Sequence, residues 1–211
     1  MNNDKSKTFL KDAYSLQDQQ SMQEFYKQWA GDYDKQMQAG LGYLSPGLIA
    51  KSLATHLPVS TTGTVVDIGC GTGLVARALT DLGYTRIDGI DFSQEMLDVA
   101  RGTGVYGELI KADLTSVVPV ADRQYAGAIC AGTFTHNHVG PEALDEITRI
   151  VETDGLLAFT VHFDLWERDG FSEKLNKMVA ESVLVELERE AGQYFAEGEV
   201  EGWFCVYRKC T

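Results

Sequence analysis

The sequence of 211 residues predicts an α/β protein with a doubly wound, mostly parallel seven-stranded sheet. Short apolar segments alternate five times with segments of helical periodicity between residues 64 and 161, which is typical of a parallel sheet covered on both faces. The apolar segment 125–131 is too continuous for a half-exposed strand. After residue 165 this alternation ends, and the last residues predict an antiparallel pair of strands at the sheet edge.

The first 57 residues predict a helical cap. Residues 1–18 are polar and indicate a mobile or loosely helical start. Apolar and aromatic side chains then recur at the spacing of an amphipathic helix: Met22, Phe25, Tyr26, Trp29, Tyr33 and Met37. A turn-rich connection over 40–47 leads to a second helix over 48–56, which ends before Pro58.

The middle of the chain supplies the alternating elements. We expect five strands, at 64–68, 87–90, 109–112, 125–131 and 156–161. We expect helices at 74–82, at 93–101 with Ser93 as N-cap, and from Pro141 onward. A turn at 154–155 leads into the fifth strand. Farther on, we expect a helix over 172–188 and a strand over 203–207, with 193–195 as part of its partner strand.

Composition narrows the function classes. The net charge is −13, from 18 basic and 31 acidic residues, which opposes binding to nucleic acid or to a membrane of anionic lipids. No run of about 18 apolar residues predicts a transmembrane helix, and the first residues lack the apolar stretch of a secretory signal, so we expect a cytoplasmic protein. The four cysteines are irregularly spaced, so we expect neither a metal site nor disulfides.

A glycine-rich loop follows the first expected strand. The segment 65–73, VVDIGCGTG, places Gly69, Gly71 and Gly73 between that strand and a helix. Glycines let the backbone turn sharply and let a ligand lie against it, and the helix N-terminus adds free N–H groups. Asp91 lies 20 residues beyond Gly71, directly after the second strand, where its carboxylate can accept both hydroxyls of a ribose. The pattern therefore predicts a nucleoside site.

Two residues distinguish the nucleoside. A dinucleotide fingerprint requires glycine where this chain has Leu74. Asp67 would repel a pyrophosphate but suits a ligand that carries an ammonium group. Charge therefore favours S-adenosylmethionine, which has an ammonium and a sulfonium but no phosphate.

The pattern D-x-G-x-G-x-G, followed by an acidic residue after the second strand, resembles the class I S-adenosylmethionine-dependent methyltransferases over about residues 20–165. The resemblance implies a Rossmann-like fold with an N-terminal helical lid, and S-adenosylhomocysteine as product. It places Asp113 and Leu114 against adenine, with Ser93 and Met96 beside the ribose and adenine. Phe92 and Ala131 are expected in the same site. An Asp that merely caps a turn is the alternative for Asp113, and core packing is the alternative for Met96.

A narrower resemblance rests on FYKQWAGDYD, DIGCGTGLVARAL and GTFTHNHVGPEAL. These segments are similar to the small methyltransferases associated with the Williams–Beuren chromosome region and to their bacterial relatives. We expect one domain over 1–211, made of an N-terminal helical cap (1–57), a cofactor-binding core (58–165), and a C-terminal helix with edge strands (166–211).

The acceptor side is expected around the loop 133–138 and after the fifth strand. His136, His138 and His162 are the candidate bases, because histidine titrates near neutrality. The alternative for each is a histidine that only bonds to backbone. Tyr26, Trp29 and Tyr33 are expected to close over the cofactor, and plain packing on the sheet is their alternative.

These observations predict metal-independent, in-line methyl transfer to a small molecule. The loop 133–138 lacks the Asn/Asp-Pro-Pro-aromatic run of adenine N6 methyltransferases. A protein or peptide methyltransferase and a non-catalytic binder of S-adenosylmethionine remain the alternatives. The acceptor atom and the oligomeric state stay open.

Overall fold

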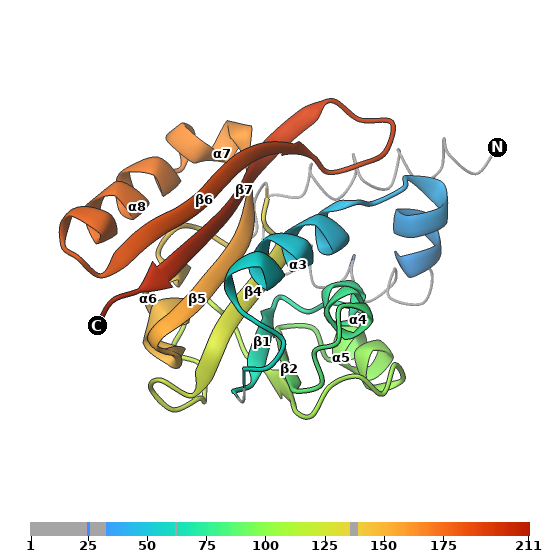
Figure 1. Ribbon diagram of the computed structural model, residues 1–211. Coiled ribbons are helices and arrows are strands. Elements are labelled where there is room, and N and C mark those ends of the chain that lie inside the picture. The colour runs from blue at the N-terminus through green and yellow to red at the C-terminus, as the bar shows by residue number, and fades with distance from the viewer. Residues whose placement is uncertain (1–24, 26–32, 62, 136–138) are drawn as a thin grey trace.

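The computed structural model describes residues 25, 33–61, 63–135 and 139–211 (Figure 1). Most of the expected aromatic helix, including Tyr26 and Trp29, lies outside these residues. The described part begins with Phe25, which is helical, and continues with a π-helix, η1, at Lys35–Gly40.

A seven-stranded sheet forms the centre of the molecule, with the strand order β3-β2-β1-β4-β5-β7-β6. The strands are β1 Val65–Ile68, β2 Ile87–Asp91, β3 Leu109–Lys111, β4 Tyr125–Phe134, β5 Val151–His162, β6 Leu184–Gln193 and β7 Val200–Lys209. Strands β1 to β5 pair in parallel, whereas β7 is antiparallel to both β5 and β6. The expected mostly parallel sheet with an antiparallel edge pair is confirmed.

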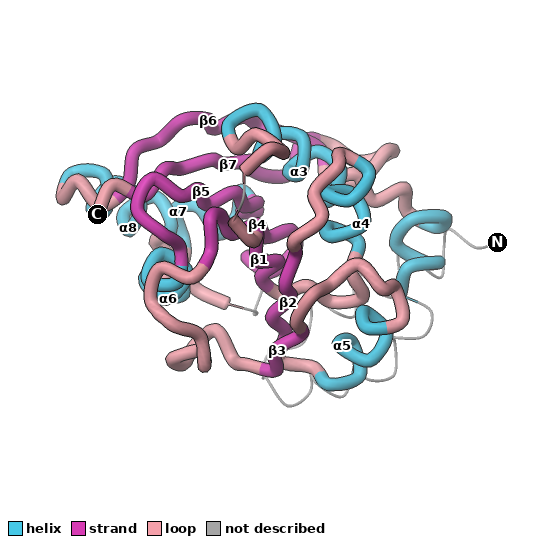
Figure 2. The backbone as a smooth tube through the Cα atoms, turned by 60° about the horizontal axis from the view of Figure 1, so that its bottom comes forward, coloured by secondary structure: helices cyan, strands magenta, loops and turns pink. Residues whose placement is uncertain are grey.

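Helices cover both faces of this sheet (Figures 1 and 2). One face carries α3 Ser45–His56, α4 Leu74–Asp81 and α5 Gln94–Arg101, and the other carries α6 Ala143–Ile150, α7 Phe163–Arg168 and α8 Phe171–Ala180. The apolar sides of α3 and α4 pack into one core cluster, and those of α6, α7 and α8 pack into a second. Burial on both faces explains why β1, apart from Asp67, and most of β4 are apolar.

Of three helix starts with local signals, the start of α5 lies where the sequence predicts it and two lie two or three residues away. The Ser93 hydroxyl accepts a hydrogen bond from the backbone N–H of Met96 at 3.2 Å and so caps α5. Helix α3 begins at Ser45, three residues before the predicted start, with Pro46 in its first turn. The helix expected from Pro141 begins at Ala143.

The helix predicted over 172–188 is wrong in its second half. Helix α8 ends at Ala180, Ser182 adopts a positive φ of 58°, and β6 begins at Leu184. The run LVELERE contains strong helix formers, but it pairs with β7 from Leu184 opposite Lys209 to Glu190 opposite Phe204, with an irregularity between Glu186 and Glu188. Long-range pairing here overrides local helix propensity.

Strands β4 and β5 extend beyond their predicted bounds. Strand β4 continues three residues past Ala131 to Phe134. Strand β5 begins at Val151, and the expected turn at 154–155 is an irregularity inside it. Asp154 has a φ of 65°, and the pairing jumps there from Tyr125 opposite Val151 to Gly127 opposite Leu156.

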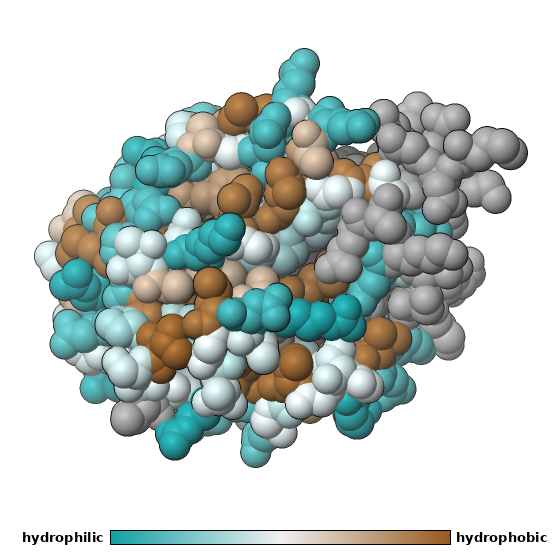
Figure 3. Space-filling view, turned by 45° about the vertical axis from the view of Figure 1, so that its right-hand side comes forward, coloured by the Kyte–Doolittle hydropathy of each residue, from teal (hydrophilic) through white to brown (hydrophobic). Residues whose placement is uncertain are grey.

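The outer surface is mixed in character. On the face shown in Figure 3, hydrophilic residues surround small groups of hydrophobic ones. Within the described part of the chain, every helix is too short or too polar to cross a membrane.

Phe134 tests the longer β4. Its fully buried ring packs against the rings of Phe159 and Phe171, with centroids 5.7 and 5.0 Å away. We expect Phe134→Ala to lower the free energy of unfolding by about 3–5 kcal/mol, measured by urea denaturation. Val117→Ala is the control, because Val117 is 83% exposed, and its effect should stay within about 0.5 kcal/mol. A loss below about 1 kcal/mol for Phe134→Ala would contradict the packing of this strand end.

Candidate functional site

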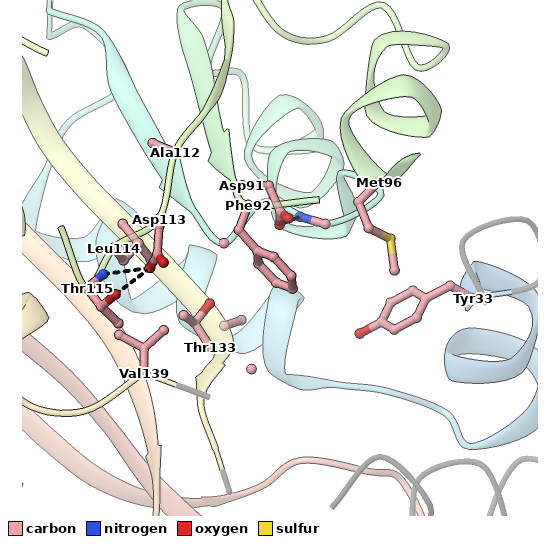
Figure 4. Close-up of a pocket in the computed structure, with 14 residues that line it drawn as sticks. Tyr33, Asp91, Phe92, Met96, Ala112, Asp113, Leu114, Thr115, Thr133 and Val139 are labelled. Atoms are coloured by element: carbon pink, nitrogen blue, oxygen red, sulfur yellow. Dashed lines mark hydrogen bonds between the residues drawn. The ribbon is translucent and has the colours of Figure 1, made fainter. Parts of the chain in front are cut away.

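A cavity of about 210 Å³ lies at the carboxyl ends of β1, β2, β3 and β4 (Figure 4). Its lining comes from the N-terminal segment, the glycine loop and the segments that follow these strands. The residues that line it are Tyr33, Gly69, Gly71, Asp91, Phe92, Met96, Ala112, Asp113, Leu114, Thr115, Ala131, Gly132, Thr133 and Val139. Open parallel sheets bind ligands at this edge.

The glycine loop forms the floor of the cavity. Gly69, Gly71 and Gly73 all have positive φ, at 65°, 53° and 98°. A Cβ atom on Gly69 would lie 2.1 Å from Oγ1 of Thr133, so only glycine fits between β1 and the end of β4. Thr133 Oγ1 in turn donates a hydrogen bond to the Ile68 carbonyl at 3.2 Å. These contacts hold the ends of two neighbouring strands together at the site.

Asp91 joins this loop to the next helix. Its Oδ2 accepts the Gly71 N–H at 2.8 Å, and its Oδ1 accepts the Ser93 N–H at 2.8 Å. Burial raises the pKa of Asp91, and these backbone hydrogen bonds oppose that rise. Each carboxylate oxygen can accept a further hydrogen bond, so the side chain suits the two neighbouring hydroxyls of a ribose.

Asp67 lies beneath the loop and outside the lining of the cavity. Its side chain is fully buried, and Tyr106 donates a hydrogen bond to its Oδ2 at 2.7 Å. Its other oxygen, Oδ1, receives no comparable hydrogen bond from the described residues. Burial above all raises the pKa of Asp67 to about 7, and the negative charge of Asp91 adds to the rise.

Asp113 faces the cavity from the segment after β3. Its Oδ1 accepts hydrogen bonds from the N–H and the hydroxyl of Thr115, at 2.9 and 2.7 Å (Figure 4). Asp113 therefore caps a turn, which was the alternative to a cofactor contact, and it also lines the cavity. Leu114 and Val139 beside it give this end an apolar surface, which suits a flat base.

The structure brings most of the predicted cofactor residues together. The cavity is lined by nine of them: Tyr33, Gly69, Gly71, Asp91, Phe92, Met96, Asp113, Leu114 and Ala131. Asp67, Gly73 and Ser93 adjoin it without lining it, because Asp67 is buried below and the other two are the N-caps of α4 and α5. Tyr26 and Trp29 lie outside the described residues.

Of the three candidate bases, the structure describes one. His136 and His138 lie outside the described residues. His162 caps α7, where its Nδ1 accepts the Asp164 N–H at 3.2 Å, and its ring lies 6.0 Å from that of Tyr194. It does not line the cavity, so its geometry supports the backbone-bonding alternative.

Some residues of the site were not predicted from the sequence. Ala112, Thr115, Gly132 and Val139 line the cavity, although none was singled out. Each lies beside a predicted site residue or in the loop next to one. That neighbourhood is the sequence signal by which these four residues can be found. Tyr106 also escaped, because nothing local indicates that its hydroxyl reaches Asp67, 39 residues earlier.

Known methyltransferases resemble this chain in sequence. A family described as "Methyltransferase domain" matches residues 66–159. Methyltransferase-like protein 27 of Homo sapiens is 29% identical over 184 residues, which are 86% of this chain and 71% of that protein. Trans-aconitate 2-methyltransferase of Azoarcus sp. is 34% identical over 112 residues, 52% of this chain and 43% of that protein. The 18S rRNA (guanine-N(7))-methyltransferase of Bos taurus is 44% identical over 55 residues, 26% of this chain and 19% of that protein.

Solved structures show the same fold. The methyltransferase of Haloferax volcanii, in complex with the Trm112 activator, has a TM-score of 0.67 and 20% identity, and the match covers 93% of this chain and all of that one. An S-adenosyl-L-methionine-dependent methyltransferase of Methanococcus maripaludis has a TM-score of 0.61 and 17% identity, with 88% and 94% covered.

Asp67 predicts an unusual dependence of stability on pH. Its folded pKa of about 7 lies above its ordinary value of 3.8, so between these values the unfolded chain is ionised and the folded chain is not. Stability from this group is complete below about pH 4 and falls as pH rises toward 7. Asp67→Asn mimics the protonated acid and should stabilise the protein, with an advantage that grows by about 2 kcal/mol from pH 5.5 to pH 8.

Urea denaturation of both proteins at the two pH values measures this difference. The other carboxyl groups titrate equally in both proteins and cancel. An advantage that does not change with pH would contradict the raised pKa of Asp67.

Proposed function

Because the chain is a class I S-adenosylmethionine-dependent methyltransferase, we propose that its cavity binds this cofactor and that a small molecule accepts the methyl group. The observation that carries the proposal is the Asp91 carboxylate, which lines the cavity with each oxygen oriented by a backbone N–H. When bound, S-adenosylmethionine supplies a methyl group on a sulfonium, and S-adenosylhomocysteine is the product.

The residues present fit the cofactor. Asp91 would hold the ribose, and the surface around Asp113, Leu114 and Met96 would hold adenine. The open backbone at Gly71, where a Cβ atom would meet nothing within 4 Å, would lie against the methionine end. A ligand that carries an ammonium group would favour the ionisation of Asp67 below the loop, whereas a pyrophosphate would oppose it.

The acceptor side would be built from Tyr33, Gly132, Thr133 and the loop that follows. Tyr33, Gly132 and Thr133 wall the cavity next to the glycine loop, where they would hold an acceptor close to the reacting carbon and exclude water. A histidine of the segment 136–138 would take the acceptor's proton if the acceptor must lose one. The chemistry asked of these residues would be to orient the acceptor and to take its proton, and neither role requires a metal ion.

Three observations support a small acceptor. The cavity is walled on one side by Tyr33, which favours an enclosed acceptor over an open groove. The net charge of −13 disfavours nucleic acid, and the Azoarcus relative carries the name of a small-molecule methyltransferase. A nucleic-acid acceptor is the second candidate, because the bovine relative is named for 18S rRNA. The absence of nucleic-acid partners and the cytoplasmic location stay predictions, as does the narrower Williams–Beuren resemblance.

Asp91 tests the cofactor site. We expect Asp91→Ala to weaken binding of S-adenosylmethionine at least about 100-fold in calorimetric titration, because two charge-assisted hydrogen bonds and the anchor of the loop are lost together. Absence of heat with the wild-type protein would contradict the site itself. Turnover is followed as release of S-adenosylhomocysteine from a metabolite extract and, separately, from total RNA and from protein. Release with none of these would favour a non-catalytic binder.

The histidines give a second test. If His136 or His138 is the base, its change to alanine should lower kcat about 100-fold or more, with little change in cofactor affinity. His162→Ala removes a helix cap and should cost about 1 kcal/mol of stability while kcat is retained. Full turnover by both the His136→Ala and the His138→Ala protein would rule out a base in this loop.

A further inference from the structure

Asp34 connects three parts of the molecule that are separate in sequence. It follows Tyr33 in the N-terminal segment. Its Oδ1 accepts a hydrogen bond from the hydroxyl of Thr72, in the glycine loop. Its Oδ2 accepts a hydrogen bond from Nη1 of Arg77, on α4, at 2.8 Å. Both oxygens of one carboxylate are therefore used to hold the N-terminal segment against the loop.

The burial of these groups shows where the contact is strong. Thr72 is almost fully buried, so its hydroxyl meets Asp34 away from water, where a hydrogen bond to a charge is strengthened. The side chains of Asp34 and Arg77 are 27% and 40% exposed, and such a pair adds little to stability. Thr72 also precedes α4, and a carboxylate is favoured near a helix N-terminus.

The position of this contact relates it to the cavity. Tyr33, next to Asp34, lines the cavity, and Gly71, next to Thr72, lines it too. Gly71 is the residue whose N–H bonds Asp91. A line of contacts therefore runs from the wall at Tyr33 through Asp34 and the loop to the carboxylate proposed to hold the ribose. Figure 4 shows Tyr33 on the same side of the cavity as Met96, facing the interior.

We propose that Asp34 is a positioning residue: by accepting hydrogen bonds from Thr72 and Arg77, it holds Tyr33 against the cofactor. The inference rests on the proposal that the cavity binds S-adenosylmethionine, and it holds for any acceptor. It predicts that Asp34 affects cofactor affinity through Tyr33 and that its contribution to folding is small.

The test compares Asp34→Asn with a matched surface pair. Asp98 and Arg101 on α5 form an Asp–Arg contact at 2.7 Å, both side chains 59% exposed and neither in the lining of the cavity. We expect Asp34→Asn to weaken calorimetric binding of S-adenosylmethionine about 10-fold, and Asp98→Asn to leave it unchanged. Both proteins should unfold thermally at about the wild-type temperature.

A double-mutant cycle decides how Asp34 acts. In a Tyr33→Ala background, Asp34→Asn should cause little further loss of affinity, because the side chain that it positions is already gone. If the fold-losses of affinity from the two single variants simply multiply in the double variant, the proposal is overturned, since Asp34 then acts independently of Tyr33. Wild-type affinity in Asp34→Asn would overturn it as well. Absence of binding by the wild-type protein would instead overturn the proposed function, and this inference with it.

Discussion

One carboxylate organises the site. Asp91 ends β2, and its two oxygens accept backbone N–H groups from the glycine loop after β1 and from the first turn toward α5. Two consecutive strand–loop–helix units are thereby joined at the carboxyl edge of the sheet. The interaction works because the side chain is nearly buried and each oxygen has a fixed donor, so its remaining acceptor capacity points to the ligand without a further loss of side-chain freedom.

The same edge carries a destabilising feature. Asp67 has a fully buried carboxyl group close enough to Asp91 that the negative charge of Asp91 disfavours the ionisation of Asp67. The hydroxyl of Tyr106 satisfies only one of its oxygens among the described residues. A buried, half-satisfied acid costs folding energy, and such groups persist where they serve a site. In this protein the acid lies directly below the backbone on which a cationic ligand is proposed to bind.

The donor side and the acceptor side differ in how they are built. The donor side uses backbone geometry and carboxylates of β1, β2 and the segment after β3, and the relatives share this part of the chain, since the family match spans residues 66–159. The proposed acceptor side uses Tyr33, which precedes the family match, and residues from the end of β4 onward. Relatives named for acids and for rRNA on one fold fit this division, because loops rather than the sheet select an acceptor.

The sequence by itself determined that the central strands are parallel and where the glycine loop and Asp91 lie, because these depend on apolar runs, turns and spacings within short stretches of chain. Only the tertiary structure decided that the run beginning at Leu184 is a strand, since that depends on pairing with residues near Lys209. It likewise decided that Tyr106 meets Asp67 and that Asp34 meets Arg77, across 39 and 43 residues. Side chains that meet over such distances leave no local periodicity, so packing alone brings them together.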